Sequence, residues 1–394
     1  MPSSFRQYSV IAIFVLSAAF CIWSYNYLAL LLVTGALAVF YFPRTYIPLS
    51  GFYKKQTSRT KNILEWVIAI FLGVLLIAVL NTYFISLYKV RSTSMKPAFR
   101  TGEVVVVDKL RAGAAVRVED ADEFQRLKGF GDFSRYDVIV FHFPEGDTVF
   151  KDRQKDNYHY LKRQYRDNPF LKKEKFSDAV YMPVKRRIKY IKRIIGLPGD
   201  TLLFRDGKGI VNGDTLPFLP SEVHTYSVMK DVPYGKKQVI LNYALNQFSK
   251  DGNIFIEISN DDVRQNDFSK FLVQKIKPLN LPDPNIFPFD ISFLWNKDNF
   301  GPVVIPEKGK TVKLTLDDLP LYERIITAYE GNSLEIKNEE ILINGKPAKS
   351  YTFKMDYFWV MGDYRPHSFD SRYWGFVPDN HIIGIVDKKL YSIN

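Results

Sequence analysis

The stretch STSMKPAFRTGEVVVVDKL, residues 92–110, decides the fold, because a hydroxyl-rich turn runs directly into a strand of four valines. Pro97 and Gly102 are turn formers, whereas consecutive β-branched residues favour an extended backbone. The same pattern of a short β-branched or aromatic run bounded by Gly, Pro, Asp or Asn recurs at 136–144, 201–204, 209–213, 311–316 and 340–345. Short strands of this kind predict a mainly β domain, either a barrel or a sandwich.

Apolar segments precede this domain. Residues 66–80, WVIAIFLGVLLIAVL, are unbroken apolar. With their flanks they predict a transmembrane helix over 63–85, because about 20 apolar residues cross ~30 Å of hydrocarbon. The runs at 10–23 and 27–42 predict either a hairpin of two membrane segments or one long tilted segment. A cleaved signal peptide is disfavoured for the first run, since more apolar sequence follows it immediately.

Charge in the intervening loop predicts the orientation. The loop at 43–62 carries five Lys or Arg residues and no acidic residue, so the positive-inside rule makes it cytoplasmic. The chain from residue 86 onward is then periplasmic or extracellular. The predicted organisation is an N-terminal hairpin and basic loop at 1–62, a helix at 63–85, a β-rich domain at 86–214 and 321–394, and an insertion or secondary β subdomain at 215–320.

Basic charge is concentrated in one segment. The net charge of +12 comes from 54 Lys and Arg against 42 Asp and Glu, and residues 151–193 hold 15 basic against 5 acidic residues. This segment has no nucleic-acid-binding motif and is predicted to lie outside the cytoplasm, so we expect no nucleic-acid partner. A solvated loop that lies on anionic lipid headgroups is the preferred interpretation. The single cysteine, Cys21, excludes an intrachain disulfide and Cys/His metal spacing.

Ser94 follows the predicted helix by only about eight residues, which span at most ~30 Å, so a reaction at Ser94 would occur at the membrane surface. A nucleophilic serine needs a base. Five histidines are present, but no GxSxG elbow surrounds any serine, which disfavours a Ser-His-Asp triad. Lys192, in YIKRIIGLPGD (190–200), has an apolar setting in which a lysine can become neutral and act as a base.

Four blocks, in order along the chain, resemble the bacterial type I signal peptidases. STSMKPAFRTGEVVVV resembles the family's SxSMxPTLxxGD block, and SRYDVIVFHFP resembles RGDIVVFxxP. YIKRIIGLPGDTL resembles KRxxGLPGD, and MGDYRPHSFDSRYWGFVP (361–378) resembles GDNRxxSxDSRxWGxVP. The resemblance covers 63–213 and 340–394, and it implies a β-rich signal-peptidase-like catalytic domain behind N-terminal transmembrane helices.

The resemblance implies Ser-Lys dyad chemistry without a metal or cofactor. Lys192 would take the proton of Ser94, whose oxygen attacks the scissile carbonyl to give an acyl-enzyme. The Ser94 backbone N–H and the Ser92 hydroxyl would form the oxyanion hole. Substrates would be preproteins whose signal peptides lie in the lipid bilayer of the plasma membrane, and the protein export machinery is a further partner that this function would allow.

The same resemblance implies supporting roles for other residues. Ser368 would hydrogen-bond to the lysine and orient it, Asp370 and Arg372 would form an ion pair, and Met95 would contact the membrane. Five residues would line small apolar pockets for Ala-x-Ala cleavage sites: Tyr88, Val90, Phe99, Tyr190 and Ile191.

Some residues depart from the family's blocks. Tyr364 stands where the family has Asn, and Pro366 and His367 replace more polar residues. These changes leave the dyad intact, whereas Arg91 and Phe99 alter the expected pocket. A catalytically inactive membrane-anchored assembly or structural protein with the same fold is the alternative, although such a protein needs neither Ser94 nor Lys192.

An internal similarity joins residues 190–213 to residues 322–345. Both stretches contain Tyr, then Arg-Ile-Ile, a Gly-rich turn and a strand ending in Asn-Gly, but the second has Glu323 where the first has Lys192. The second copy is therefore interpreted as structural. Two unrelated hairpins are the alternative explanation.

Overall fold

The computed structural model describes residues 57–117, 124–153, 156–164, 176, 178–273 and 281–391. The apolar runs at 10–23 and 27–42 lie outside these residues, as does most of the basic loop. The chain divides into two compact units. The described part of the first comprises 57–86, 108–116 and 124–131, and most of the remaining chain forms the second.

The first unit contains α4 (Ser58–Val79), which continues into a π-helical turn, η1 (Leu80–Phe84). The Thr57 hydroxyl caps α4 by accepting a hydrogen bond from the Thr60 N–H at 3.4 Å. A helix thus forms where one was predicted over 63–85. In the described part of the chain, however, no helix has the length and apolar content needed to span a membrane. The spanning character of this segment is therefore not confirmed.

A small apolar cluster holds the rest of the first unit together. Tyr83, Ala114 and Leu127 are buried against one another. Gly113 adopts a φ of +85°, and a Cβ there would lie 1.8 Å from the Leu127 carbonyl oxygen. Only glycine fits this approach between the two chain segments.

The second unit is built on a seven-stranded sheet, with its strands in the order β1-β2-β24-β5-β8-β22-β23. These strands are β1 (Ile85–Lys89), β2 (Val104–Asp108), β24 (Ile382–Tyr391), β5 (Val138–His142), β8 (Lys189–Gly196), β22 (Tyr357–Met361) and β23 (Val377–Pro378). The pairings β24–β5, β5–β8 and β8–β22 are antiparallel. The prediction of a mainly β fold is confirmed, and each of the six predicted runs contains a strand.

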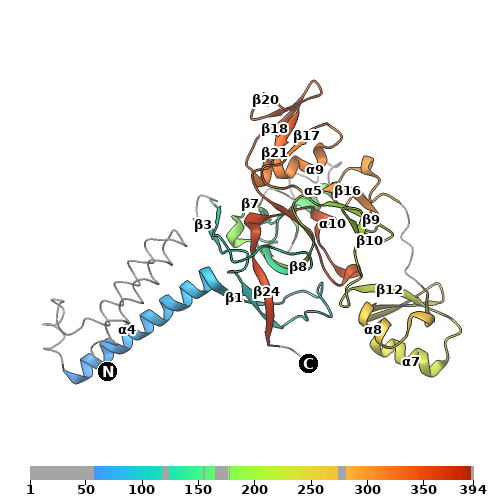
Figure 1. Cartoon of the computed structure of the whole chain (residues 1–394), viewed down its shortest axis with the longest axis horizontal. Coiled ribbons are helices and arrows are strands. Elements are labelled where there is room, and N and C mark those ends of the chain that lie inside the picture. Colours follow the sequence, from blue (N-terminus) through green and yellow to red (C-terminus); the bar gives the residue numbers. More distant parts are fainter. Residues whose placement is uncertain are drawn as a thin grey trace. The chain divides into compact units, whose positions relative to one another are not determined.

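Smaller sheets complete the β structure (Figure 1). The first has the order β11 (Asp214–Thr215), β10 (Lys208–Val211), β9 (Thr201–Arg205) and β16 (Phe300–Val304). The second has the order β13 (Asn246–Lys250), β14 (Asn253–Ser259), β12 (Val223–Val228) and β15 (Leu272–Val273). The others are β18 (Leu334–Lys337), β19 (Glu340–Ile343) and β20 (Lys346–Pro347), and the pairs β17 (Thr311–Lys313) with β21 (Ser350–Thr352), β6 (Thr148–Phe150) with β7 (Ala179–Tyr181), and β3 (Ala115–Arg117) with β4 (Phe124–Arg126).

The other helices are short. The α-helices are α5 (Tyr158–Gln164), α7 (Tyr234–Tyr243), α8 (Asn260–Gln265), α9 (Leu319–Arg324) and α10 (Ser371–Trp374). Single turns are η2 (Val184–Arg186), η3 (Ser269–Phe271), η4 (Ile291–Phe293), η5 (Ile325–Tyr329), η6 (Arg365–His367) and η7 (Asp379–His381).

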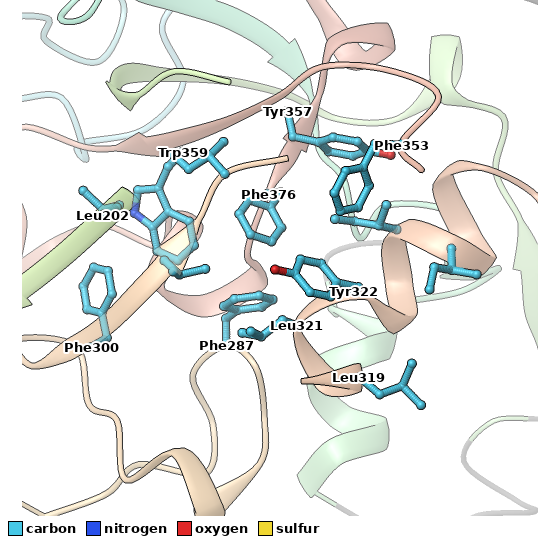
Figure 2. Close-up of a cluster of buried hydrophobic side chains, with 14 of the residues drawn as sticks. Leu202, Phe287, Phe300, Leu319, Leu321, Tyr322, Phe353, Tyr357, Trp359 and Phe376 are labelled. Carbon is cyan, nitrogen blue, oxygen red and sulfur yellow. The ribbon is translucent and has the colours of Figure 1, made fainter. Parts of the chain in front are cut away.

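The largest core is aromatic and joins β22 to β9, β16 and α9 (Figure 2). Phe300 stacks on Phe204 with ring centroids 4.6 Å apart, and on Trp359 at 5.3 Å. Phe287 meets Trp359 and Phe376 edge to face. Such pairs contribute stability beyond their buried area, so this core fixes β22 and the segment that follows it.

The predicted insertion at 215–320 contains two different parts. Residues 223–273 contain a separate four-stranded sheet and the helices α7 and α8, seen in the yellow-green part of Figure 1. They enclose a separate apolar cluster that includes Ile240, Ile256 and Phe268. Strand β16 instead pairs with β9. We therefore call residues 221–273, which carry this separate sheet, the insert.

The second halves of the two similar stretches, residues 201–213 and 333–345, also have similar structures. The turns at Asp206-Gly207 and Asn338-Glu339 both have positive φ. The Thr201 N–H donates to Asn212 Oδ1 at 2.8 Å, and Ser333 N–H donates to Asn344 Oδ1 at 2.9 Å.

The preceding halves differ, because 190–196 is strand and 322–329 is helical. The similarity is therefore a pair of like hairpins. Glu323 lies on α9 and has no counterpart of Lys192's strand environment.

Candidate active site

Ser94 lies in a turn that is closed across its base by backbone hydrogen bonds. Val90 N–H donates to the Glu103 carbonyl, and Gly102 N–H donates to the Val90 carbonyl, each at 2.8 Å. The turn follows β1 and leads into β2. Ser94 is 5% exposed, and its carbonyl oxygen accepts a hydrogen bond from the Tyr364 N–H at 3.0 Å. Main-chain hydrogen bonds thus close the base of the turn and hold the Ser94 carbonyl.

Lys192 lies in the middle of β8, opposite Ile139 of β5, and is 3% exposed. Its Nζ donates hydrogen bonds to Ser94 Oγ and, at 3.2 Å, to the Ile191 carbonyl. The structure therefore brings together the two residues that the sequence singled out, although 98 positions separate them.

Burial lowers the pKa of the Lys192 amine to about 8, because removal from water disfavours the ammonium form. The charges of Asp370 and Asp363 oppose this shift, whereas Arg372 adds to it. A lysine whose pKa is near 8 is partly neutral at physiological pH. It can therefore accept a proton from a hydroxyl with which it is in contact.

The Ser92 hydroxyl lies 3.0 Å from Ser94 Oγ. This places a second hydroxyl beside the serine. Ser92 is exposed and Ser94 is buried, so the pair lies where the surface of the domain meets its interior.

Asp370 and Arg372 form the predicted ion pair. Arg372 Nε donates to Asp370 Oδ1 at 2.8 Å, and a second guanidinium nitrogen donates to Oδ2 at 2.9 Å. Burial alone would raise the pKa of the Asp370 carboxyl, but the Arg372 charge and hydrogen bonds, with that of the Gly362 N–H, hold it below its usual value. The pair is bidentate and buried, which is the arrangement that orients a turn most firmly.

Ser368 is buried beside these groups, but within the described residues its hydroxyl makes no hydrogen bond to Lys192. Gly362 explains how closely the segments approach. A Cβ at this position would lie 2.2 Å from Ser368 Oγ and 2.5 Å from the Ser94 carbonyl oxygen. The absence of a side chain at Gly362 therefore allows the Ser368 turn and the Ser94 turn to meet.

Sequence reasoning missed the group on the other face of β8. Arg193 pairs with the buried carboxylate of Asp363 through two hydrogen bonds of 2.8 and 2.6 Å. A third Arg193 nitrogen donates to the Tyr136 carbonyl at 2.9 Å. The pair fixes β8 at the residue next to Lys192. Its only sequence signal was the alternation that directs Arg193 away from Lys192.

The predicted pocket residues separate into three groups. Val90 and Ile191 are fully buried in one apolar cluster, and Tyr88 and Phe99 pack against it while partly exposed. Tyr190 instead lies among aromatic rings, with its centroid 5.8 Å from that of Trp374 and 5.5 Å from Lys192 Nζ. Within this set, Tyr88, Phe99 and Tyr190 retain surface that a substrate could touch.

The structure contradicts the predicted membrane contact of Met95. It was predicted to contact the membrane, but it is 0% exposed and packs in the same cluster as Val105 and Val107. The physical reason is that the turn directs the apolar thioether into the sheet while the neighbouring Thr93 stays in solvent. Met95 is therefore a core residue that anchors the turn of the serine.

Comparison with known proteins defines the class. The profile of the family described as signal peptidase, peptidase S26, matches residues 63–262 and 349–391, and the chain belongs to this family. It is similar to Signal peptidase I of Buchnera aphidicola subsp. Baizongia pistaciae (strain Bp), with 20% identity over 86% of this chain and 80% of the relative.

Two further relatives carry similar names. Signal peptidase I of Buchnera aphidicola subsp. Acyrthosiphon pisum (strain APS) is 22% identical over 92% of this chain and 90% of its own length. Signal peptidase I P of Bacillus subtilis subsp. natto is 24% identical over 41% of this chain and 57% of its own length. The similarity thus extends to relatives from both Buchnera and Bacillus.

Proposed function

We propose that this protein is a serine endopeptidase that removes signal peptides from exported preproteins. The observation that carries the proposal is the buried Lys192 amine in contact with Ser94 Oγ. Family membership and relatives named Signal peptidase I support it. No cofactor or metal takes part in the proposed chemistry.

In the proposed reaction the neutral Lys192 amine accepts the proton of the Ser94 hydroxyl as Oγ bonds to the scissile carbonyl carbon. The tetrahedral oxyanion is stabilised by the Ser94 N–H and the Ser92 hydroxyl. Collapse breaks the C–N bond, and Lys192 returns the proton to the leaving amine. Water, deprotonated by Lys192, then hydrolyses the acyl-enzyme and regenerates Ser94.

The surrounding ion pairs keep the two reacting side chains in register. Asp370 and Arg372 hold the turn that carries Ser368, and Arg193 and Asp363 hold β8 beside Lys192. Displacement by about 1 Å can lower a rate ~100-fold, so rigid support next to the reacting atoms has catalytic value. In this proposal Asp370 and Arg372 are positioning residues, whereas Ser368, whose hydroxyl makes no hydrogen bond to Lys192 within the described residues, is assigned no role in orienting the lysine.

Substrate selection is proposed to involve small apolar residues at the cleavage site. Tyr88 and Phe99 are partly exposed at the edge of the cluster under Ser94, which supports contact with the substrate. Val90 and Ile191 would shape this surface from beneath. The Tyr88 hydroxyl donates to the Lys189 carbonyl at 3.0 Å, which fixes the orientation of its ring.

Attachment to the plasma membrane, with the catalytic domain on its periplasmic or extracellular face, also remains a proposal. It is supported by a row of exposed apolar side chains on α4: Ile63, Trp66, Val67, Ile70, Phe71, Val74, Leu76 and Ile77. Exposed apolar surface of this extent is unusual for a helix in water and favours contact with lipid. Lipid and the export machinery would then be partners in addition to preproteins.

The test is cleavage of a purified preprotein with an Ala-x-Ala site in liposomes. We expect the full-length protein to cleave after the second Ala, and Ser94→Ala and Lys192→Met to lose nearly all activity. Thr93→Ala and Lys189→Met are matched controls, because both residues are exposed neighbours of the dyad and should retain activity. Full activity in Lys192→Met would refute the dyad, and an inactive wild type would favour an assembly or structural role.

A further inference from the structure

We propose that the insert positions the catalytic pair, and that Glu257 is the residue through which it acts. This inference rests on the proposed peptidase function. The Glu257 carboxylate holds Tyr364 and His367, which lie on the segment that joins the Ser94 contact to Ser368. The insert would thus be a working part of the active site.

Glu257 is a buried acid with a defined set of partners. It lies on β14 of the insert and is 4% exposed. Its Oε2 accepts a hydrogen bond from the Tyr364 hydroxyl at 2.6 Å and one from Asn246 Nδ2 at 3.0 Å, and it lies 2.9 Å from His367 Nε2. A buried carboxylate is costly unless it is well paired, so these contacts are what make its burial tolerable.

The insert also binds residues 363–365 through its backbone and through the side chains of Ser221 and Glu222. Val223 N–H donates to the Asp363 carbonyl at 2.9 Å, and Val223 bridges to Tyr364 in parallel. Ser221 Oγ donates to Asp363 Oδ2 at 2.7 Å. Glu222 forms an ion pair with Arg365. Residues 363–365 and 367 are therefore all held by the insert.

The segment held by the insert contacts Ser94 directly and contacts Lys192 through its neighbour in the chain, Arg193. Tyr364 donates its N–H to the Ser94 carbonyl, and Asp363 pairs with Arg193, the neighbour of Lys192. A shift of Tyr364 would therefore move Ser94 relative to Lys192. The Glu257–Tyr364 hydrogen bond joins the insert to the serine through a single residue.

Two of the residues that Glu257 contacts are positions where the chain departs from the family's block. Tyr364 supplies a phenol where the block has Asn, and His367 supplies an imidazole. Burial and the adjacent Glu257 carboxylate raise the Tyr364 pKa, so the phenol stays protonated and remains a donor. The two residues that differ from the family's block, Tyr364 and His367, therefore both bind Glu257 of the insert.

The variants are Glu257→Ala, Glu257→Gln and Tyr364→Phe. We expect Glu257→Ala and Tyr364→Phe to lower kcat about tenfold, the loss expected for a hydrogen bond to a charged group, with little change in KM. Glu257→Gln keeps an oxygen that can accept from Tyr364 and should retain most of kcat. Ser259→Ala is the control, since this buried serine caps α8 within the insert and its hydroxyl bonds to Asp262 of the same helix.

A pH profile distinguishes positioning from loss of stability. Among the described residues, the charged groups that shift the Lys192 pKa are Asp370, Asp363 and Arg372, and Ser94 and the Tyr190 ring are in contact with the amine. Glu257 is not one of these groups, so we expect its removal to affect Lys192 only by loosening the packing around it. Looser packing lets water reach the amine, which raises the Lys192 pKa toward its ordinary value. We expect the acidic limb of kcat/KM to move to higher pH in Glu257→Ala and to stay in place in Ser259→Ala.

A readout without catalysis separates this inference from the proposed function. In a Cys21→Ser, Ser94→Cys protein the only thiol is at position 94, and its alkylation rate against pH reports pairing with Lys192. Addition of Glu257→Ala should shift this profile, and addition of Ser259→Ala should not.

A shifted alkylation profile in a protein that cleaves no preprotein would refute the function and leave the positioning intact. Unchanged kcat, unchanged acidic limb and unchanged alkylation in Glu257→Ala would overturn the positioning, whatever the melting temperature does.

Discussion

Substitution of Gly362 by alanine should displace Ser94, and with it the proposed catalytic pair, from the segment that holds it. The new Cβ would lie 2.5 Å from the Ser94 carbonyl oxygen, about 1 Å inside the 3.4 Å at which ordinary contact begins. The Ser94 carbonyl cannot yield easily, because it also accepts the Tyr364 N–H. A displacement of about 1 Å at the nucleophile should lower kcat ~100-fold, and the overpacking should cost ~1–3 kcal/mol of stability.

The assay is steady-state cleavage of a preprotein, together with thermal unfolding of each variant. Gly235→Ala is the matched control, because a Cβ there meets nothing within 4 Å and the residue lies in α7, where alanine is favoured. Adding Ser368→Ala to Gly362→Ala removes the contact with Ser368 Oγ at 2.2 Å but leaves those with the Ser94 carbonyl oxygen at 2.5 Å and Ser368 Cβ at 2.8 Å, so activity should not return. Wild-type kcat in Gly362→Ala would refute the close approach on which this reasoning depends.

Three other predictions follow from the charges in the site. The kcat/KM profile should rise through pH 8, because the Lys192 pKa is about 8 and only the neutral amine is a base; a limb near pH 6 would contradict this. The free energy of unfolding should increase from pH 8 to 10.5. In this window Lys192 binds more protons in the unfolded protein, where its pKa is 10.5, than in the folded protein, where its pKa is about 8. Lys192→Met should accordingly gain up to about 3 kcal/mol at pH 7, measured by urea unfolding; an unfolding free energy below that of wild type would contradict it. Asp370→Asn should lose ~3–5 kcal/mol by stranding the Arg372 charge, whereas Glu335→Gln, which breaks an exposed pair, should change little; equal losses would refute this difference.

The strands could be predicted because their signal is local. A run such as EVVVVD has β-branched residues and turn formers within a few positions, and all six predicted runs contain strands. The like hairpins after Asp200 and Asn332 follow the same logic, because Asn-Gly at their ends favours positive φ. The helical start of the second copy was not predictable from this similarity.

The contact between Ser94 and Lys192 could be expected because their motifs are specific, but the contacts that surround them could not. Arg193 and Asp363 are 170 positions apart, and Glu257 and Tyr364 are 107 apart. No local pattern links such residues, since their pairing depends on which strands become neighbours. The error at Met95 has the same origin, because its sequence position beside the predicted helix did not reveal which way the turn would direct it.

The order of strands in the large sheet also bears on how the enzyme is made. β24 is the last strand along the chain, yet it lies between β2 and β5 in the sheet. Ser94 is held between β1 and β2, and Lys192 lies on β8 beside β5, so the two residues of the proposed dyad share a sheet only after β24 inserts. During synthesis, a nascent chain that stops before residue 382 would carry both residues but lack the strand that joins their two parts of the sheet. The proposed peptidase activity would therefore depend on a strand that lies almost 200 positions beyond Lys192 and contains neither reacting residue.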